Sequence, residues 1–345
     1  MAAELQDSII CPNENPKFPE YKGFTVNFED IDIQWDKGKW EFQHPAVGRV
    51  VKSTYPLLNP LYWNEISHRL NKGETAAVFM LGNFGVVKKL ESPEWENAKQ
   101  KEGSADALFD KVKKRPRQQN FVALAHPEDM IDIIDLDRVV DKRFRSQLRF
   151  PGGRERLYPG PLHIILPVRD KGFVNKALIR EEDKTIAVFW ANHFGFEGLV
   201  HASRRKIKHG ILGGGSLNIH GKEPCYTKEE LYHEMGNQPD WLEEIDFIVF
   251  DDIAEAGNIG RSHTMIRFLG QEPELVRIGS LSKEKIEQKT GHKLTVLPNI
   301  KYASSTTVYS DEANVLANRK VEEVLFRIKR FENKFRTHSS HSGRK

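Results

Sequence analysis

Short apolar runs separated by charged, helix-like stretches are the feature that most limits the folds open to this chain. These runs are Ala76–Leu81, Phe121–Leu124, Leu162–Val168, Ile186–Trp190 and Ile245–Phe250. Apolar runs of this length bounded by turn residues are typical of buried strands. Strands that alternate with short helical segments over residues 74–290 predict one α/β domain.

The last of these runs ends in a group of carboxylates. Asp251 and Asp252 follow the run directly, Glu255 comes three residues later, and the glycines at 257 and 260 predict a turn. Strand ends followed by glycine-bearing loops are where α/β folds keep their chemistry. Three carboxylates repel one another unless a cation, a proton or a guanidinium offsets their charge. The stretch Ile245–Arg267 is therefore either an acidic loop in water or a functional site.

Composition limits the compartment and the class of protein. The 345 residues include only two cysteines, Cys11 and Cys225, so neither a disulfide framework nor a structural zinc site is expected. The N-terminal residues lack the basic and apolar regions of a secretory signal, and no apolar run approaches the roughly 20 residues that span a bilayer. We expect a soluble, cytoplasmic protein with no membrane association and no metal site.

The distribution of charge points to a polyanionic partner. Nine acidic residues and four lysines give residues 1–48 a charge of −5. Because the whole chain carries +3, residues 49–345 must carry +8. The basic residues form three clusters: Lys111, Lys113, Lys114, Arg115 and Arg117; Arg138, Lys142, Arg143, Arg145 and Arg149; and Arg204, Arg205, Lys206 and Lys208. Clustered Lys and Arg suit a phosphate backbone, because each neutralised phosphate releases counterions. Charged helix surfaces would explain any single cluster, but three together favour RNA.

Capping and turn residues divide the chain. Asn59, Thr227 and Ser282 are predicted helix N-caps, and the glycines from Gly210 to Gly215 predict a turn before Ser216. The predicted division is an N-terminal arm with strands that pack on the core (1–58, with a hairpin turn at 36–38), an α/β core (59–290), an extension with a helix opened by Asp311 (291–336) and a disordered tail (337–345).

Five short motifs, in order, resemble the YrdC-type threonylcarbamoyl-AMP synthase family. They are Lys113-Lys114-Arg115-Pro116, similar to K-x-R-P; Tyr158-Pro159-Gly160-Pro161-Leu162, similar to W-P-G-P-L; Ser216-Leu217-Asn218-Ile219-His220-Gly221, similar to S-A-N-x-S-G; Thr264-Met265-Ile266 with Gly270, similar to S-T-V-V; and Arg277-Ile278-Gly279, similar to R-P-G. The resemblance covers residues 73–287. It implies a twisted mixed sheet with flanking helices and a basic concave face, extended here by N-terminal strands and a C-terminal helix.

The departures from that family concern its amino-acid pocket. The segment that holds threonine in the family falls on Phe79–Val86 and lacks both threonines, Phe189 replaces an arginine, and His263 replaces a serine. An apolar side chain in place of a hydrogen-bonding one would leave buried polar groups unpaired. We therefore expect a retained scaffold with a rebuilt pocket, and no synthesis of threonylcarbamoyl-AMP.

A second resemblance concerns the acidic stretch. Asp251-Asp252-Ile253-Ala254-Glu255 is similar to the D-D-x-x-E motif of the fungal arginine-containing cyclodipeptide synthases. The motif also occurs as a magnesium motif in prenyl-chain enzymes, but there it lies on a helix of an all-α fold. The resemblance implies a transferase of secondary metabolism that condenses arginine from arginyl-tRNA with a second aminoacyl-tRNA to a cyclo(Arg-X) diketopiperazine. Because the esters are already activated, no ATP and no other cofactor is expected.

The predicted catalytic residues are Asp251, Asp252 and Glu255. One carboxylate would take a proton from the attacking amine, and a second would hold the arginine guanidinium bidentately; which residue does which stays open. The predicted substrate and tRNA contacts are Lys113, Arg115, Ser216, Asn218, Thr264 and Arg277. For Glu255 the alternative is a salt bridge with Arg261 or Arg267, for Lys113 and Arg115 a solvated surface, and for Ser216 and Asn218 an ordinary polar turn.

Two other functions remain open from the sequence. One is a diverged carbamoyl-adenylate synthase that uses ATP and bicarbonate, and the other is a non-catalytic binder of tRNA or double-stranded RNA. The identity of the second amino acid, the existence of an acyl-enzyme on Ser216 with His220 as base, a proton-shuttling role of His263, the oligomeric state and the role of the acidic N-terminal arm are also left open.

Overall fold

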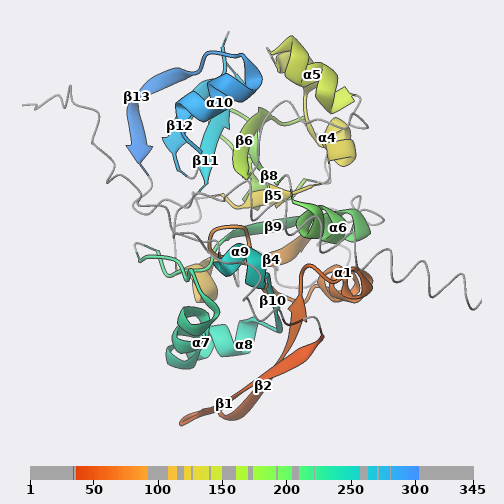
Figure 1. Cartoon of the computed structure of the whole chain (residues 1–345), viewed down its shortest axis with the longest axis vertical. Helices are drawn as coiled ribbons and strands as arrows, with labels where there is room; N and C mark the ends of the chain where they lie inside the picture. The colour runs from red at the N-terminus through yellow and green to blue at the C-terminus, as the bar shows by residue number, and fades with distance from the viewer. Residues whose placement is uncertain are drawn as a thin grey trace, which may run out of the picture.

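The fold is built on one large mixed sheet, seen in the computed structural model of the chain (Figure 1). The structure describes residues 34, 36–91, 108–114, 120–125, 127–139, 141–149, 161–169, 174–191, 193–203, 210–220, 222–256, 263–269, 272–279 and 281–302. Within these residues thirteen strands form a single sheet in the order β1-β2-β10-β3-β4-β9-β5-β8-β6-β11-β12-β13, with β7 paired to β8. The predicted α/β class with a mixed sheet is confirmed.

The strands are β1 (Gly38–His44), β2 (Gly48–Pro56), β3 (Ala76–Phe79), β4 (Phe84–Glu91), β5 (Val122–Leu124), β6 (Leu162–Pro167), β7 (Ile179–Arg180), β8 (Thr185–Trp190), β9 (Gly210–Ser216), β10 (Phe247–Phe250), β11 (Thr264–Arg267), β12 (Glu274–Ile278) and β13 (Thr295–Tyr302). Strand β10 lies between β2 and β3 and is parallel to both. The carboxyl ends of these three parallel strands therefore lie at one edge of the sheet, where the chain leaves them for loops.

The helices are α1 (Trp63–Asn71), α4 (Pro127–Ile133), α5 (Lys142–Arg149), α6 (Phe194–Ser203), α7 (Lys228–Asn237), α8 (Pro239–Glu244), α9 (Asp252–Ala256) and α10 (Lys283–Thr290), with shorter turns η2 (Pro60–Tyr62), η3 (Leu108–Lys113), η4 (Leu136–Arg138) and η5 (Lys176–Leu178). In Figure 1, α4, α5 and α10 lie beside the end of the sheet that holds β11–β13, and α7 and α8 lie beside the end that holds β1 and β2. Helix α9 occupies the middle of the view, between the two groups.

The predicted caps are confirmed. The side chains of Asn59, Thr227 and Ser282 accept backbone N–H groups at the starts of η2, α7 and α10, and α10 ends on Gly291 at φ +69°. Each of these predictions depended on a local hydrogen bond between neighbours in the chain. Local chemistry of this kind is readable before the fold is known.

One local prediction was wrong. The glycines from Gly210 to Gly215 form strand β9, which pairs with β4 along its whole length, because a Cβ at Gly213 would lie 2.4 Å from the Leu90 side chain. A hairpin joins β1 and β2 at 45–47, and the strand expected before the predicted turn at 36–38 falls largely on residues outside the described ranges. The arm before residue 34, the C-terminal helix and the tail lie outside the described residues.

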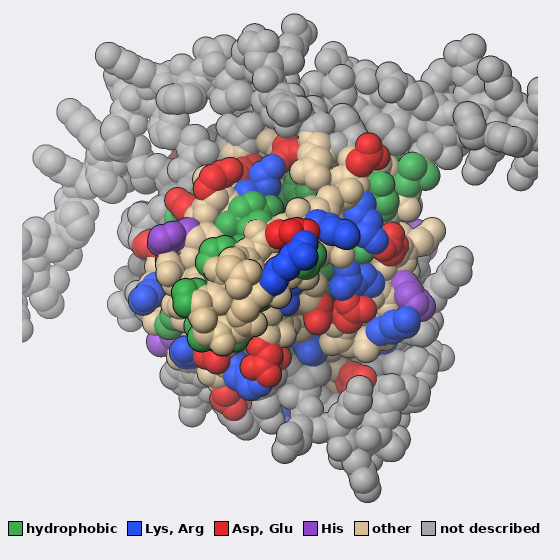
Figure 2. All heavy atoms as spheres, turned by 90° about the horizontal axis from the view of Figure 1, so that it is seen from below, with side chains coloured by type: hydrophobic (Ala, Val, Ile, Leu, Met, Phe, Trp, Pro, Cys, Tyr) green, Lys and Arg blue, Asp and Glu red, His purple; other side chains and the backbone are tan. Residues whose placement is uncertain are grey.

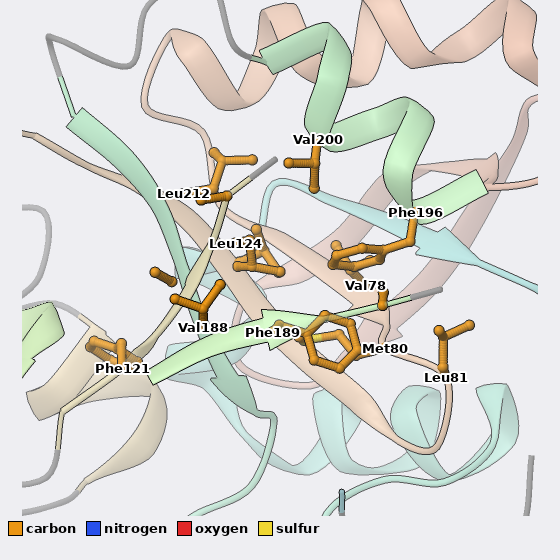
Figure 3. Close-up of a cluster of buried hydrophobic side chains, with 14 of the residues drawn as sticks. Val78, Met80, Leu81, Phe121, Leu124, Val188, Phe189, Phe196, Val200 and Leu212 are labelled. Atoms are coloured by element: carbon orange, nitrogen blue, oxygen red, sulfur yellow. The ribbon is translucent and has the colours of Figure 1, made fainter. Parts of the chain in front are cut away.

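Part of the hydrophobic core fills the space between the sheet and α6. Figure 3 shows Val78, Met80 and Leu81 from β3 and the turn after it in one cluster with Phe189 from β8 and Phe196 from α6. The rings of Phe189 and Phe196 meet edge to face at 4.8 Å between centroids. The core therefore reaches the edge of the sheet at which β3 ends, and its close packing makes the structure there rigid.

The contact between α1 and α6 depends on Gly198. A Cβ at this position would lie 2.3 Å from the Trp63 ring, which packs over the glycine. We expect Gly198→Ala to lower the free energy of unfolding by about 1–3 kcal/mol, because the added methyl group overpacks a closed interface. Denaturant unfolding measures the change. Gly215→Ala is the control, since its Cβ would meet no atom nearer than 3.6 Å; an equal loss in both variants would contradict the account.

Candidate functional site

The turn from Met80 to Asn83 is the centre of the candidate site. Met80 donates its N–H to the Asn83 carbonyl at 2.8 Å, and both residues are buried. Leu81 is buried in the left-handed region at φ +58°, where residues other than glycine are strained. Three groups of polar side chains surround this turn: the acids after β10, a lysine cluster at the end of β9, and a histidine–arginine cluster next to β11.

The acids follow a strand that pairs with β3 just before the turn. The last residue pair between β10 and β3 is Val249 with Val78. Asp251 and Met80 each follow two residues later, at the ends of these two neighbouring strands. Asp251 is buried, and its Oδ2 lies 3.2 Å from Nε2 of His193, whose side chain is also fully buried. Its Oδ1 accepts the Ala254 N–H at 2.9 Å and so caps α9. The predicted acidic loop is therefore a capped helix, and His193 is a member of the site that the sequence did not reveal.

Asp252 is held from two sides. Its Oδ1 pairs with the Lys228 ammonium, and its Oδ2 accepts the backbone N–H of Gln34 at 2.9 Å. The carboxylate is nearly inaccessible, so an anion here is stabilised by the lysine and the amide rather than by solvent. Both oxygens are engaged within the protein, which leaves Asp252 as an anchor between α7, α9 and the segment that precedes β1.

Glu255 differs from the two aspartates. Its Oε1 accepts the backbone N–H of Lys228 at 2.7 Å, at the start of α7, while its Oε2 is buried without a hydrogen-bond partner among the described residues. Burial raises the pKa of Glu255 to about 7, against the lowering effect of Lys228 and with a further rise from Glu229 and Asp252. A carboxyl group with this pKa exchanges a proton near neutral pH.

The raised pKa of Glu255 predicts a pH-dependent stability. The unfolded carboxyl group ionises near pH 4.5 and the folded one near pH 7, so stability falls as the pH rises between these values and stays low above them. We expect Glu255→Gln to raise the free energy of unfolding by about 1–3 kcal/mol at pH 8 and to leave it unchanged at pH 4. Urea unfolding at the two pH values tests this.

The matched control for that experiment is Glu243→Gln. The Glu243 side chain is 71% exposed and lies 3.8 Å from Lys111, so solvent screens its charge. Its replacement is expected to change stability little at either pH. A Glu255→Gln variant that behaves like this control would show that the Glu255 carboxyl is not desolvated.

The second group joins three of the predicted binding residues. Lys113 is buried, and its ammonium donates to the Ser216 carbonyl and, at 3.0 Å, to Oδ1 of Asn218. The Ser216 hydroxyl donates to the same Oδ1 at 2.8 Å. Segments about a hundred residues apart thus form one cluster with a positive charge at its centre. Arg115 lies outside the described residues.

Thr264 and Arg277 belong to the third group. Arg277 donates from Nε and Nη2 to the His263 carbonyl at 2.9 and 2.7 Å, and burial lowers the pKa of its guanidinium to about 10. Thr264 is fully buried and bonds to Gly279 and Leu281, which fixes β11 against the chain after β12. A buried guanidinium with two donors on one carbonyl stays charged and is available to an anionic ligand.

Histidine and phenylalanine rings fill the space next to Arg277. The His263 ring lies 4.9 Å from Phe189 and 5.1 Å from His163, between centroids. Burial lowers the pKa of His263 to about 3, with a further lowering by Arg277 and an opposing effect of the Leu81 and Met80 carbonyls. His263 is thus neutral at physiological pH and does not shuttle protons there. These are the positions at which the sequence departs from the YrdC-type pattern.

A cavity of ≈ 340 Å³ adjoins the lysine cluster. It shares Asn218 with that cluster and is lined further by Ile219, Lys222, Glu223, Pro224, Cys225, Tyr226, Glu230, His233, Glu234 and Trp241. Its size is at the lower end of the range of about 300–1,000 Å³ typical of small-molecule pockets. Three glutamates give its wall a negative charge, in contrast to the Lys113 ammonium at its border. Sequence reasoning missed this cavity because its lining comes from a loop and one face of α7.

The basic clusters are less available than the sequence suggests. Lys111 pairs with Glu244 at 2.6 Å and Lys114 with Asp240 at 3.1 Å, so the acids of α8 and its vicinity neutralise part of the first cluster. Figure 2 looks onto the end of the molecule that carries β1, β2, α7 and α8, and there Lys and Arg side chains are interspersed with Asp and Glu. The third cluster, residues 204–208, lies outside the described residues. RNA as a partner therefore stays a prediction.

Comparison with known proteins places these groups in a family context. A family model described as "Telomere recombination", which stands for the Sua5, YciO and YrdC proteins, matches residues 99–279. A threonylcarbamoyl-AMP synthase of Idiomarina loihiensis is 30% identical over 131 residues, which is 38% of this chain and 63% of that enzyme. The P. abyssi Sua5 structure with L-threonine superposes with a TM-score of 0.51 at 19% identity, over 70% of this chain and 60% of the other. E. coli YciO gives a TM-score of 0.47 at 17% identity, over 66% and 94%.

These comparisons confirm the YrdC-like fold and correct one expectation. The chain spans less than two thirds of the length of the synthase and of Sua5. The synthase is named for an adenylate product, and relatives of this kind use ATP, so the prediction that no ATP acts at the site was wrong. The matches do not point to a cyclodipeptide synthase. Within the described residues, no helix is long and apolar enough to cross a membrane, and no group of three metal-ligating side chains is present.

Proposed function

The chain belongs to the Sua5/YciO/YrdC family, and from that premise we propose that it is an ATP-using synthase that forms a carbamoyl-adenylate on an amino acid other than threonine. The observation that carries the proposal is the Lys113–Ser216–Asn218 cluster, which keeps three polar side chains of the family motifs in mutual hydrogen-bond contact. A buried ammonium and a buried guanidinium, from Lys113 and Arg277, are suited to the phosphates of a nucleotide.

The amino-acid substrate is proposed to be basic. The turn from Met80 to Asn83 presents apolar side chains, and the adjacent space holds Phe189 and His263, which give a threonine hydroxyl no charged partner. The cavity next to Asn218 offers Glu223, Glu230 and Glu234 instead. A carboxylate wall matches a guanidinium or an ammonium group, and arginine can engage it through two parallel hydrogen bonds. We therefore propose arginine as the first amino acid to test.

Glu255 is the proposed proton acceptor. An α-amino group must be neutral before its nitrogen can form a new bond to carbon, and a carboxyl group with a pKa of about 7 can take the proton near neutral pH. Glu255 binds the N–H of Lys228 at the start of α7, and the cavity-lining residues Tyr226 and Glu230 flank that same turn. Asp251 and Asp252 are proposed to support Glu255 rather than to contact substrate.

A second candidate is the tRNA-dependent synthase of cyclo(Arg-X) diketopiperazines. Two observations favour it: the D-D-x-x-E acids meet at one buried site, and an acidic cavity suits arginine. Here the partners are arginyl-tRNA and a second aminoacyl-tRNA, the lysine cluster and Arg277 contact the tRNA 3′ end, and the amine attacks an ester in place of bicarbonate. The need for a neutral amine, and so for Glu255, is the same in both candidates.

One pair of assays separates the candidates. The purified full chain is incubated with ATP, bicarbonate and each amino acid, and pyrophosphate is measured; the first candidate predicts release that is faster with arginine than with threonine. In parallel, extracts of a bacterial host expressing the chain are searched by mass spectrometry for arginine-containing diketopiperazines, which RNase should abolish in lysate. Pyrophosphate without diketopiperazine supports the carbamoyl-adenylate synthase, and the reverse supports the cyclodipeptide synthase. Neither product, with RNA binding that falls steeply with salt, would favour a non-catalytic binder.

A further inference from the structure

The His193 side chain caps the start of α6. Its Nδ1 accepts the backbone N–H of Phe196 at 3.3 Å, as an N-terminal cap does. An imidazole nitrogen that accepts a hydrogen bond carries no proton, so the proton of the neutral ring is on Nε2. Nε2 lies 3.2 Å from Oδ2 of Asp251, and both side chains are fully buried. No well-aligned hydrogen bond joins the two atoms, and Oδ2 of Asp251 accepts none from the other described residues, so the 3.2 Å contact with the imidazole is what faces this oxygen.

Asp251 transmits this contact to α9. Its Oδ1 accepts the Ala254 N–H at 2.9 Å, and its backbone carbonyl accepts the Glu255 N–H at 2.8 Å. A helix of one turn has no stability of its own and forms only where its caps and contacts hold it. Asp251 is the residue that caps this turn. The orientation of α9, and with it the direction of the Glu255 side chain, follows from the position of Asp251.

Charged and aromatic side chains of α7 and α9 surround Glu255. Lys228 and Glu229 belong to the start of α7, Asp252 to the first turn of α9, and Tyr232 to the next turn of α7, where its ring stacks on Trp40 at 5.1 Å between centroids. Burial raises the pKa of Tyr232 to about 12, and the charge of the Glu255 carboxylate is the next largest cause of the rise. The two groups therefore lie close together. A small rotation of α9 would move the carboxyl group out of this environment and towards water.

We propose that His193 is a positioning residue, which acts through Asp251 and α9 to hold the Glu255 carboxyl group for proton transfer from the substrate amine. The inference rests on the proposed role of Glu255, and it holds for either acyl donor, because both reactions need a neutral amine. The part of His193 is to fix Asp251, whose second oxygen and carbonyl then fix the helix.

The test compares two substitutions at one position. His193→Phe keeps an aromatic ring and removes the polar contact with Asp251, while His193→Gln keeps an N–H group near the place of Nε2. Carboxyl NMR titration of Glu255 in the full chain is the first readout, and it needs no activity. We expect the pKa of Glu255 to fall by at least one unit in His193→Phe and to stay near 7 in His193→Gln. An unchanged value in His193→Phe would overturn the proposal, provided that amide spectra show the variant folded.

Kinetics give the second readout. In the assay in which the wild type turns over, we expect His193→Phe to lower kcat at least tenfold with little change in KM, and His193→Gln to restore it to within a few-fold. The double variant His193→Phe/Glu255→Gln should be no slower than Glu255→Gln alone, because one residue acts through the other. Independent, multiplying losses would overturn the proposal. If instead Glu255→Gln itself has wild-type activity, the proposed role of Glu255 fails, and the NMR titration still decides whether His193 positions its side chain.

Should His193→Phe fail to fold, His193→Asn is used in its place. Its side-chain oxygen can still accept the Phe196 N–H, but the side chain is too short to reach Asp251, so the cap of α6 is kept and only the second contact is lost. The same fall in the pKa of Glu255 and in kcat is expected. Wild-type values of both in this variant would overturn the proposal.

Discussion

Lys113→Met is expected to lower the affinity for ATP, and with it kcat/KM for pyrophosphate release, by about 100-fold or more. The Lys113 ammonium is buried between the Ser216 carbonyl and Oδ1 of Asn218, so it places a positive charge at the centre of that cluster. Methionine has a similar length and keeps the packing, but it brings no charge to the phosphates. Isothermal titration with a non-hydrolysable ATP analogue measures the loss directly.

The matched control is Lys111→Met, two residues earlier on the same segment. Lys111 is half-exposed and pairs with Glu244, so its removal should leave ATP affinity within about twofold of the wild type. Thermal unfolding of both variants shows whether either change acts through the fold. ATP binding that survives Lys113→Met at full strength would contradict the placement of the nucleotide at this cluster.

Glu255→Gln is expected to reduce kcat by about 10²–10⁴-fold near neutral pH, since the amide cannot accept a proton. The wild-type rate should rise with pH through about 7, where the Glu255 carboxyl ionises, and this rise should be absent from the residual rate of the variant. KM should change little, because the neutral side chain can still accept the Lys228 N–H. Because the same variant is expected to be more stable at pH 8, a loss of rate there would not come from unfolding.

Glu229→Gln serves as the control for the rate measurement. Glu229 is an exposed neighbour on α7 whose charge acts on Glu255 only through space. Its replacement should lower the pKa of the pH–rate profile slightly and leave the maximal rate unchanged. Equal losses in the two variants would show that the charge of this region matters, but not the proton acceptor at 255.

How much of this molecule is readable from the sequence depends on the range of the contacts. The buried strands at Ala76–Phe79, Ile186–Trp190 and Phe247–Phe250 were predicted because their apolar runs are continuous, and the caps at Thr227 and Ser282 because their bonds are local. Strand β9 was misjudged because its glycines serve close strand packing, which depends on a partner far away in the chain. A run of glycines can form either a turn or a closely packed strand, so the sequence alone does not distinguish the two.

The site shows the same limit more strongly. The acids at 251, 252 and 255 were found because they are adjacent, but their separate roles depend on His193, Gln34 and Lys228, which the fold brings in from elsewhere. No local pattern around His193 distinguishes it from an ordinary cap. The cavity beside Asn218 was missed for the same reason. The wrong expectation about ATP came from the short acidic motif at 251–255. The YrdC-type motifs, which are spread over residues 113–279, implied a nucleotide instead.

The most direct test of the central claim, that this chain joins ATP, bicarbonate and a basic amino acid at the Lys113 cluster, is one mass spectrum. The purified full chain is incubated with ATP, ¹³C-bicarbonate and arginine, and the products are resolved without a coupling enzyme. We expect an arginine-derived carbamoyl-adenylate that carries one ¹³C, formed together with pyrophosphate and absent when Lys113→Met replaces the wild type. No labelled adenylate with arginine or any other amino acid, from a folded chain that releases an arginine-containing diketopiperazine in a bacterial host, would contradict the claim.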